Sequence, residues 1–290
     1  MATATLLISC PDQKGLVAKI SDWIFSHNGN ILDAAQHTDS NINLFLMRIE
    51  WDLEAFALTR EEIAPTFTPF AIAIQAQWQI HFSDYVPRLA IFVSKQNHCL
   101  YDLILRQRSQ EFIATIPVVI SNHPDLESIA HDFGINYHYI PLTPETKQAQ
   151  EQQQLALLRQ YQIDLVVLAK YMQVLSPAFL AQFSQVINIH HSFLPAFAGA
   201  NPYQRAYQRG VKIIGATAHY VTEELDEGPI IEQDVIRVSH RDSVSDLIRK
   251  GKDLERIVLA RAIRQHLDNR VLVYGKSEQS GLGLRTVVFD

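Results

Sequence analysis

The most informative stretch of this sequence reads Val186-Ile-Asn-Ile-His-His-Ser-Phe-Leu-Pro195. Its first half alternates as a β-strand does, and the proline that closes it forces a loop. Asn188 and His190 are two residues apart, so on a strand their side chains leave the same face. We expect this strand to present them to a site, because burying such groups without partners is costly.

Asn188 and His190 together have the chemistry needed for attack on a carbonyl group. The imidazole can move a proton near neutral pH, and the amide can donate to a developing oxyanion. A packing or capping role for His190 is an equally good interpretation of this stretch alone. A third polar residue from elsewhere in the chain is needed to decide between the two.

Asp226 is the expected third residue, in the segment Gly215-Ala-Thr-Ala-His-Tyr-Val-Thr-Glu-Glu-Leu-Asp-Glu-Gly-Pro-Ile230. Residues 213–221 and 230–238 have the pattern of strands, and the acidic stretch between them, closed by Gly-Pro, predicts a long hairpin loop. Asp226 follows an apolar leucine, whereas the neighbouring glutamates fit solvent-exposed loop charge. A carboxylate beside an imidazole orients it and stabilises its charged form.

These motifs closely resemble those of the folate-dependent formyltransferase family, whose best-known member is glycinamide ribonucleotide formyltransferase. The resemblance rests on Asn188-Ile-His190, on Ser192-Phe-Leu-Pro195 and on the segment from His219 to Pro229, in that order. A further segment, Leu165-Val-Val-Leu-Ala-Lys-Tyr-Met-Gln-Val-Leu-Ser-Pro-Ala-Phe179, is similar to the strand and folate loop of that family. The resemblance covers roughly residues 88–269.

The resemblance implies that Asn188, His190 and Asp226 act on the formyl group of 10-formyltetrahydrofolate. It also implies that two loops bind the folate. Their candidate residues are Met172, Val174, Leu175, Glu223, Glu224 and Leu225. The folate would be the substrate, so no cofactor is expected.

Within this family the chain most resembles the hydrolytic branch, the formyltetrahydrofolate deformylases. Enzymes that use glycinamide ribonucleotide have a glycine-rich loop after their first strand, where backbone N–H groups hold the substrate phosphate. The corresponding segment here, Ser94-Lys-Gln-Asn-His-Cys-Leu-Tyr-Asp102, contains no glycine, although Lys95 could attract an anion. An additional N-terminal domain favours the same branch. The implied reaction releases formate and tetrahydrofolate, supplies formate for purine biosynthesis and balances the one-carbon folate pools.

Two other functions stay open. A formyltransferase with a phosphorylated amine as acceptor would use the same polar residues. A catalytically inactive amino-acid sensor is the third interpretation, and the complete set of Asn188, His190 and Asp226 argues against it.

The first 82 residues have a pattern of their own. Strands are predicted at 3–9, 31–38, 42–51 and 75–82, with helices at 16–27 and 60–70. This order is typical of a ferredoxin-like sandwich. The turn that leads into its first helix, Asp12-Gln-Lys-Gly15-Leu16, resembles that of an ACT domain. That resemblance implies an amino-acid effector, glycine or methionine, near Asp12, Gly15 and Leu16, and a homo-oligomer formed by ACT pairing. A purely structural or dimerising domain is the alternative.

Residues 83–87 are the expected linker, and residues 88–290 are the expected catalytic domain. Its predicted strands lie at 88–93, 115–121, 165–169 and 186–190, and its predicted helices at 99–110, 126–133, 148–161, 178–183, 203–209 and 244–266. Apolar strands that alternate with helices predict a doubly wound, mostly parallel sheet with the site at the strand carboxyl ends. The expected fold class is therefore α/β, a ferredoxin-like sandwich followed by a formyltransferase-type domain.

Composition sets the remaining limits. The 290 residues, 47% of them hydrophobic, fit two ordinary soluble domains. A net charge of −6 argues against a nucleic-acid partner, and no signal peptide or membrane span is predicted. Cys10 and Cys99 cannot form a disulfide framework and indicate a reducing cytoplasm. Cys99, beside His98, is expected to be buried or capping rather than a reactive thiolate, and the histidine spacings predict no metal site.

Overall fold

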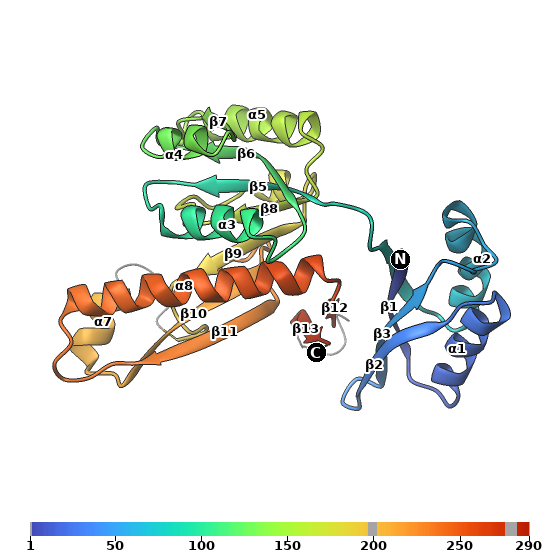
Figure 1. The fold of residues 1–290 in the computed structure, drawn as a ribbon. Helices are drawn as coiled ribbons and strands as arrows, with labels where there is room; N and C mark the ends of the chain where they lie inside the picture. Colours follow the sequence, from blue (N-terminus) through green and yellow to red (C-terminus); the bar gives the residue numbers. More distant parts are fainter. Residues whose placement is uncertain (1, 197–201, 276–282, 290) are drawn as a thin grey trace. The chain divides into compact units, whose positions relative to one another are not determined.

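The computed structural model describes residues 2–196, 202–275 and 283–289, which form two compact units (Figure 1). The first unit contains the residues up to Val86 together with those from Asp268 onward. The second unit runs from Pro87 to Leu267. Within the described ranges, no helix is long and apolar enough to cross a membrane.

The first unit is built on an antiparallel sheet in the order β2-β3-β1-β4, with two helices. Its elements are β1 (Thr3–Pro11), α1 (Leu16–Ser26), β2 (Ile31–Asp39), β3 (Leu44–Asp52), α2 (Arg60–Ala73) and β4 (Gln77–Phe82). This order and pairing define a ferredoxin-like sandwich, so the predicted class of this unit is confirmed.

One face of this sheet holds the core of the first unit. Leu6 and Ile8, two apart on β1, belong to one buried cluster with Ile20 of α1 and Phe67 of α2. Helix α2 contains two prolines, and a capping box between Thr59 and Glu62 begins it. The helices cover this face because their apolar residues recur at helical spacing.

The opposite face of the same sheet is covered by a C-terminal hairpin. It consists of β12 (Val271–Tyr274) and β13 (Arg285–Val288), which pair antiparallel. Leu272 and Phe289 pack there with Leu7 and Leu46. The second unit therefore ends earlier than the expected domain of residues 88–290. Strands of four residues carry little periodic signal, so the sequence did not predict the hairpin.

The second unit contains a sheet in the order β11-β10-β9-β8-β5-β6-β7, parallel from β9 to β7 and antiparallel at β10 and β11. The strands are β5 (Arg88–Val93), β6 (Thr115–Ser121), β7 (Asn136–Tyr139), β8 (Leu165–Leu168), β9 (Val186–His190), β10 (Ile213–Tyr220) and β11 (Ile230–Arg237). The helices are α3 (His98–Arg108), α4 (Glu127–Asp132), α5 (Lys147–Gln160), α6 (Pro177–Leu180), α7 (Pro202–Arg209) and α8 (Val244–Leu267). The predicted doubly wound, mostly parallel class is confirmed. The short, polar β7 was not predicted.

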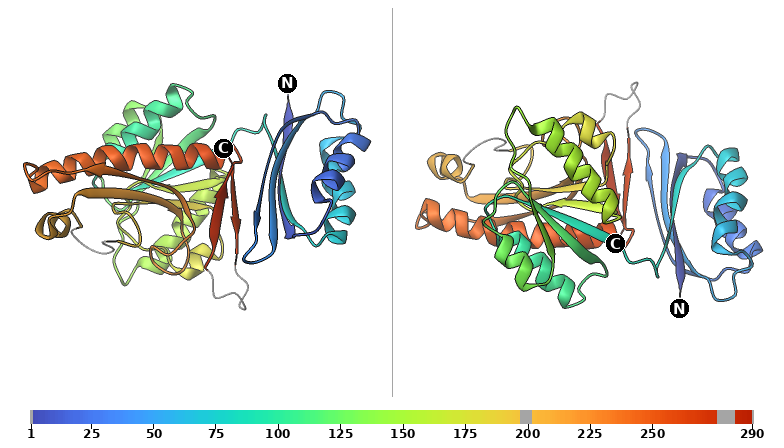
Figure 2. Two further views of the ribbon diagram at one scale, coloured as in Figure 1. Left: turned by 90° about the horizontal axis from the view of Figure 1, so that it is seen from below. Right: turned by 90° about the horizontal axis from the view of Figure 1, so that it is seen from above.

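Both faces of the central strands are buried. Every residue of β8 is buried, as is every residue of β5 after Arg88. On one face, Phe92 and Val166 pack with Leu155 of α5 and Phe179 of α6. Helix α8 packs against α3 and runs along β10 and β11 (Figures 1 and 2).

The strand order places the predicted site at one edge of this sheet. The order reverses beside β5, because β6 lies on one side of it and β8 on the other. In open α/β sheets such a switch point leaves a crevice at the strand carboxyl ends. Ser94 follows β5, Lys170 lies just beyond β8, and His190 ends β9. Polar residues therefore follow three neighbouring strands at this edge of the sheet.

Candidate active site

The structure brings Asn188, His190 and Asp226 together. Asn188 and His190 lie two apart on β9, and Nδ1 of His190 lies 3.2 Å from Oδ1 of Asp226. The hydrogen bond from His190 lowers the pKa of Asp226, so this carboxylate is ionised at neutral pH. Because an ionised carboxylate only accepts, the proton of this contact lies on Nδ1 of His190.

The other ring nitrogen of His190 is the one left for chemistry. Nε2 is buried and has no hydrogen-bond partner among the residues that the structure describes. Buried polar atoms are almost always paired, so this nitrogen is open to a water molecule or a substrate atom. With the proton on Nδ1, Nε2 carries the lone pair that can accept a proton from water or a substrate.

His219 completes the site, although the sequence did not single it out. It lies opposite Asn188 in the pairing of β9 with β10, and its Nε2 is 3.2 Å from Nδ2 of Asn188. Its Nδ1 lies 2.9 Å from the carbonyl oxygen of Tyr220, which only accepts. Nδ1 therefore carries the proton, and Nε2 accepts from the Asn188 amide. Burial lowers the pKa of His219, which keeps this ring neutral.

The loop that carries Asp226 is held by a close backbone approach. A Cβ atom on Gly228 would lie 1.7 Å from the carbonyl oxygen of Tyr220, so only glycine fits there. The N–H of Tyr220 donates to the carbonyl of Pro229 (3.0 Å). Asp226 itself has φ 60°, a left-handed conformation that aspartate tolerates better than most residues. The Gly-Pro motif thus fixes the position of the carboxylate.

The six candidate folate residues separate into two groups. Met172, Val174 and Leu225 are more than half exposed, and Glu223 and Glu224 are exposed as well. Leu175 is 5% exposed and packs in the core with Phe179. Its side chain anchors the loop to the core and is not exposed to a ligand.

The loop that contains Met172 is anchored at both ends by buried polar groups. The N–H of Met172 donates to Oγ of Ser94 (3.0 Å), and Ser94 donates to Asn122 (2.6 Å). At the other end, the buried Glu151 accepts from the backbone N–H of Ser176 (3.0 Å) and from its hydroxyl. Hydrogen bonds therefore fix both ends of the loop that carries these exposed apolar residues.

Known proteins are similar to this chain in both sequence and fold. Residues 87–263 match the family model described as formyl transferase. A formyltetrahydrofolate deformylase of Synechocystis is 63% identical over 99% of this chain and 98% of its own length. The chain belongs to the formyltetrahydrofolate deformylase family. The family resemblance that the motifs indicated is thereby confirmed.

Solved structures of the deformylase family extend over both units. A formyltetrahydrofolate deformylase from Pseudomonas syringae pv. tomato matches with a TM-score of 0.94 at 46% identity, over 100% of this chain and 95% of its own. A glycinamide ribonucleotide transformylase from Symbiobacterium toebii has a TM-score of 0.64 at 30% identity, over 72% of this chain and 97% of its own. The deformylase therefore accounts for more of the chain than the transformylase does.

A second cluster of polar side chains lies in the same unit of this deformylase-family chain. His98, Cys99 and Glu255 are residue types that bind metals, and their ligand atoms lie within 4.8 Å of one another. Glu255, however, accepts from His98 (2.7 Å) and Tyr203 (2.7 Å), and the ammonium of Lys170 lies 3.4 Å from it. Burial raises the pKa of Cys99, which keeps the thiol protonated. Because a lysine already supplies the cation, we assign no metal to this cluster.

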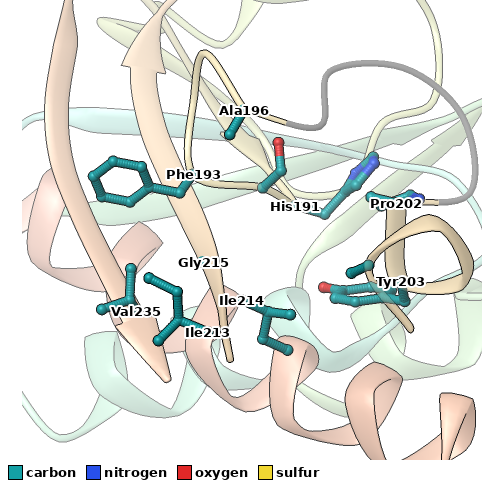
Figure 3. Close-up of a pocket in the computed structure, with 11 residues that line it drawn as sticks. His191, Phe193, Ala196, Pro202, Tyr203, Ile213, Ile214, Gly215 and Val235 are labelled. Atoms are coloured by element: carbon teal, nitrogen blue, oxygen red, sulfur yellow. The ribbon is translucent and has the colours of Figure 1, made fainter. Parts of the chain in front are cut away.

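An apolar cavity of about 140 Å³ lies behind the loop that follows β9 (Figure 3). It is lined by His191, Ser192, Phe193, Ala196, Pro202, Tyr203, Ala206, Ile213, Ile214, Gly215 and Val235. Figure 3 shows His191 and Tyr203 on one side of this cavity and Ile213 and Val235 on the other. This volume is smaller than that of most ligand sites, and we do not assign the folate to this cavity.

The candidate effector residues lie at the start of α1. Asp12 and Gly15 are exposed, and Gly15 has φ 85° at the position that caps the helix. Leu16 is 2% exposed and belongs to the core, so its side chain cannot contact a ligand. The backbone of this turn remains the candidate contact for an amino acid.

Proposed function

We propose that this chain hydrolyses 10-formyltetrahydrofolate to formate and tetrahydrofolate at the carboxyl end of β9. The observation that carries the proposal is the arrangement of His190, whose Nδ1 is held by Asp226 while its buried Nε2 lacks a protein partner. Membership of the deformylase family supports the same reaction.

The proposed mechanism uses His190 as the group that moves the proton. Nε2 of His190 takes a proton from water as the water oxygen bonds to the formyl carbon. Asp226 stabilises the imidazolium through Nδ1. Collapse of the tetrahedral intermediate breaks the bond between carbon and nitrogen, and the proton on Nε2 passes to the leaving nitrogen. Formate and tetrahydrofolate result.

Asn188 is the proposed donor to the oxyanion. An amide NH₂ group has two hydrogens, and the contact with His219 uses one of them. The other can donate to the oxygen that becomes negatively charged in the tetrahedral intermediate. His219 thereby orients the amide nitrogen, because its own proton is engaged by the Tyr220 carbonyl. The folate is the substrate, and the proposed chemistry requires no cofactor.

The exposed members of the candidate folate loops are the proposed folate contacts. Met172, Val174 and Leu225 offer apolar surface for the flat rings of the substrate. Their backbone and the neighbouring residues Glu223 and Glu224 offer hydrogen-bonding groups. Ser94 and Glu151 would keep one of these loops preorganised.

The first unit is the proposed regulatory domain, of the ACT type. It contributes none of Asn188, His190 and Asp226, which all lie in the second unit. We propose that the carboxylate of glycine or methionine binds the backbone N–H groups around Gly15, at the start of α1. Pairing of these domains would form a homo-oligomer, through which the effector acts.

The reaction would supply formate for purine biosynthesis and balance the folate pools of the cell. Both cysteines are buried and free, which fits a reducing cytoplasm.

The test is to measure formate release from 10-formyltetrahydrofolate with no acceptor added. The proposal predicts stoichiometric formate, and no formylated product when glycinamide ribonucleotide is supplied. Formylated glycinamide ribonucleotide as the main product would contradict the hydrolase and favour a transferase.

A further inference from the structure

We propose that Lys170 is a positioning residue for this hydrolysis: it holds the ring of His191, and His191 in turn holds the imidazole of His190. The rings of His190 and His191 are stacked, with centroids 4.7 Å apart and planes at 18°. Nζ of Lys170 lies 3.3 Å from Nδ1 of His191. The inference rests on the role proposed above for His190.

Lys170 has an unusual conformation for a residue with no direct contact to the proposed reaction. Its φ is 64°, in the left-handed region that favours glycine, and its side chain is 5% exposed. Such backbone strain persists only where the surroundings demand it, and it concentrates at functional sites. A buried ammonium also needs a negative partner.

Glu255 is that partner, and other elements of the unit hold it in place. His98 of α3 and Tyr203 of α7 both donate to its carboxylate, which is 1% exposed on α8. Tyr203 reaches it over Gly251, where a Cβ atom would lie 2.0 Å from the tyrosine hydroxyl. Burial alone would raise the pKa of Glu255, but these hydrogen bonds and the charge of Lys170 bring it well below its usual value.

Stability alone does not explain such a pair. A buried ion pair contributes little net stability compared with apolar residues of the same size, because both charges lose their hydration. Here His98 of α3 and Tyr203 of α7 hold Glu255 of α8. Glu255 in turn holds one lysine beside the stacked histidines. The arrangement is explained if the lysine must be held at a defined position.

Lys170 determines which ring nitrogen of His191 carries the proton. An ammonium group only donates, so Nδ1 of His191 accepts and the ring carries its proton on Nε2. A second positive charge on His191 would lie 3.3 Å from the ammonium, which favours the neutral ring. A neutral aromatic ring stacked on His190 limits its rotation, and it tolerates the positive charge that His190 acquires during hydrolysis.

Several ionisable groups face this pair of rings, and each of them can contribute to the pH profile of kcat. Asp226, on the loop after β10, lies beside both His190 and His219 of β10. His191 faces Lys170 after β8 and Tyr203 from α7. Behind Lys170 lie Glu255 of α8 and His98 and Cys99 of α3.

The test combines Lys170→Met with Glu255→Gln in the full chain, so that neither change leaves a buried charge unpaired. Methionine keeps a long unbranched side chain, so the left-handed backbone meets no new steric demand. We expect kcat for formate release to fall about tenfold to a hundredfold, as for a misplaced catalytic group, while KM stays near the parental value. The pH profile of kcat should also shift, because the charges of Lys170 and Glu255 beside the stacked histidines are gone.

The matched control is Lys250→Met with Asp242→Asn, which removes another lysine–carboxylate pair of the same unit (2.8 Å). It should keep parental kcat and the parental pH profile. A folded Lys170→Met/Glu255→Gln variant with the same kcat and profile as this control would overturn the inference. If that variant is unfolded, Glu255→Gln alone decides, and parental kinetics in it would overturn the inference equally. His190→Ala distinguishes the two claims, because retained activity there contradicts the proposed function itself.

Discussion

The Nδ2 atom of Asn188 lies 3.2 Å from Nε2 of His219, across the pairing of β9 with β10. This contact fixes which way the Asn188 amide points, because the proton of His219 is already donated to the Tyr220 carbonyl. The donor of the site is therefore preorganised by a neighbouring strand. Preorganised donors stabilise an oxyanion at no cost in reorientation during the reaction.

Asn188→Ala should lower kcat by about a hundredfold or more, as removal of a single oxyanion donor does. Folate binding should change little, because the donor acts mainly on the intermediate. His219→Phe should lower kcat by a smaller factor, since it removes only the group that orients the amide. Steady-state formate release checks both. Equal losses in the two variants would contradict the indirect role of His219.

Asp226→Asn tests the electrostatic part of the site. Asparagine also tolerates the left-handed backbone at this position, so the fold should survive. The amide can no longer stabilise a charged His190, so kcat should fall by orders of magnitude.

The same variant has a defined pH dependence of stability. The pKa of Asp226 is lowered from 3.8 in the folded chain by its bond with His190. A carboxylate of this kind stabilises the fold above its unfolded pKa, and that contribution is lost as pH falls through the lower, folded pKa. Thermal unfolding should show parent and Asp226→Asn converging in stability as the pH falls below about 4. A difference in stability that widens on acidification would contradict the prediction that this carboxylate is ionised in the folded chain.

Gly228→Ala should displace the loop that carries Asp226. The added Cβ would meet the Tyr220 carbonyl oxygen at 1.7 Å, and this contact is with backbone that cannot yield easily. We expect a loss of kcat together with a destabilisation of more than about 2 kcal/mol. Gly210→Ala is the control, since its Cβ would meet nothing within 4 Å and only its φ of 66° is unfavourable. It should cost about 1–2 kcal/mol and leave kcat unchanged.

Gly15→Val tests the proposed effector site. A β-branched residue is strained at φ 85° and would shield the N–H groups at the start of α1, although no atom lies within 4 Å of its Cβ. Basal hydrolysis should persist, while any response to glycine or methionine disappears. Calorimetric titration and activity of the full chain with both amino acids provide the measurement. Absence of binding by the parent chain would leave the first unit as an assembly element.

The sequence predicted both folds because their signals are local. Strands such as β8 are continuous apolar runs, and the Asn188–His190 spacing follows directly from strand geometry. Asp226 was expected beside His190 from its chemistry and its place before the Gly-Pro turn, although a loop residue has no periodicity that fixes its position. His219 was missed because its role depends on strand register, which the sequence does not contain. The burial of the Leu175 side chain was not predicted, because exposed and buried residues of a loop look alike in sequence.

The C-terminal hairpin and the Glu255 cluster lay beyond sequence reasoning for a related reason. Both depend on contacts between segments far apart in the chain, such as Leu272 with Leu7 and His98 with Glu255. A single sequence gives no measure of such proximity.

The role of His190 as proton acceptor is tested most directly by formate release from His190→Ala under single-turnover conditions, with folate binding measured in parallel. The variant should bind the folate nearly as well as the parent does. The rate of formate release should fall by at least about a hundredfold, because the proton acceptor is gone. A folded His190→Ala variant that releases formate at the parental rate would contradict the account.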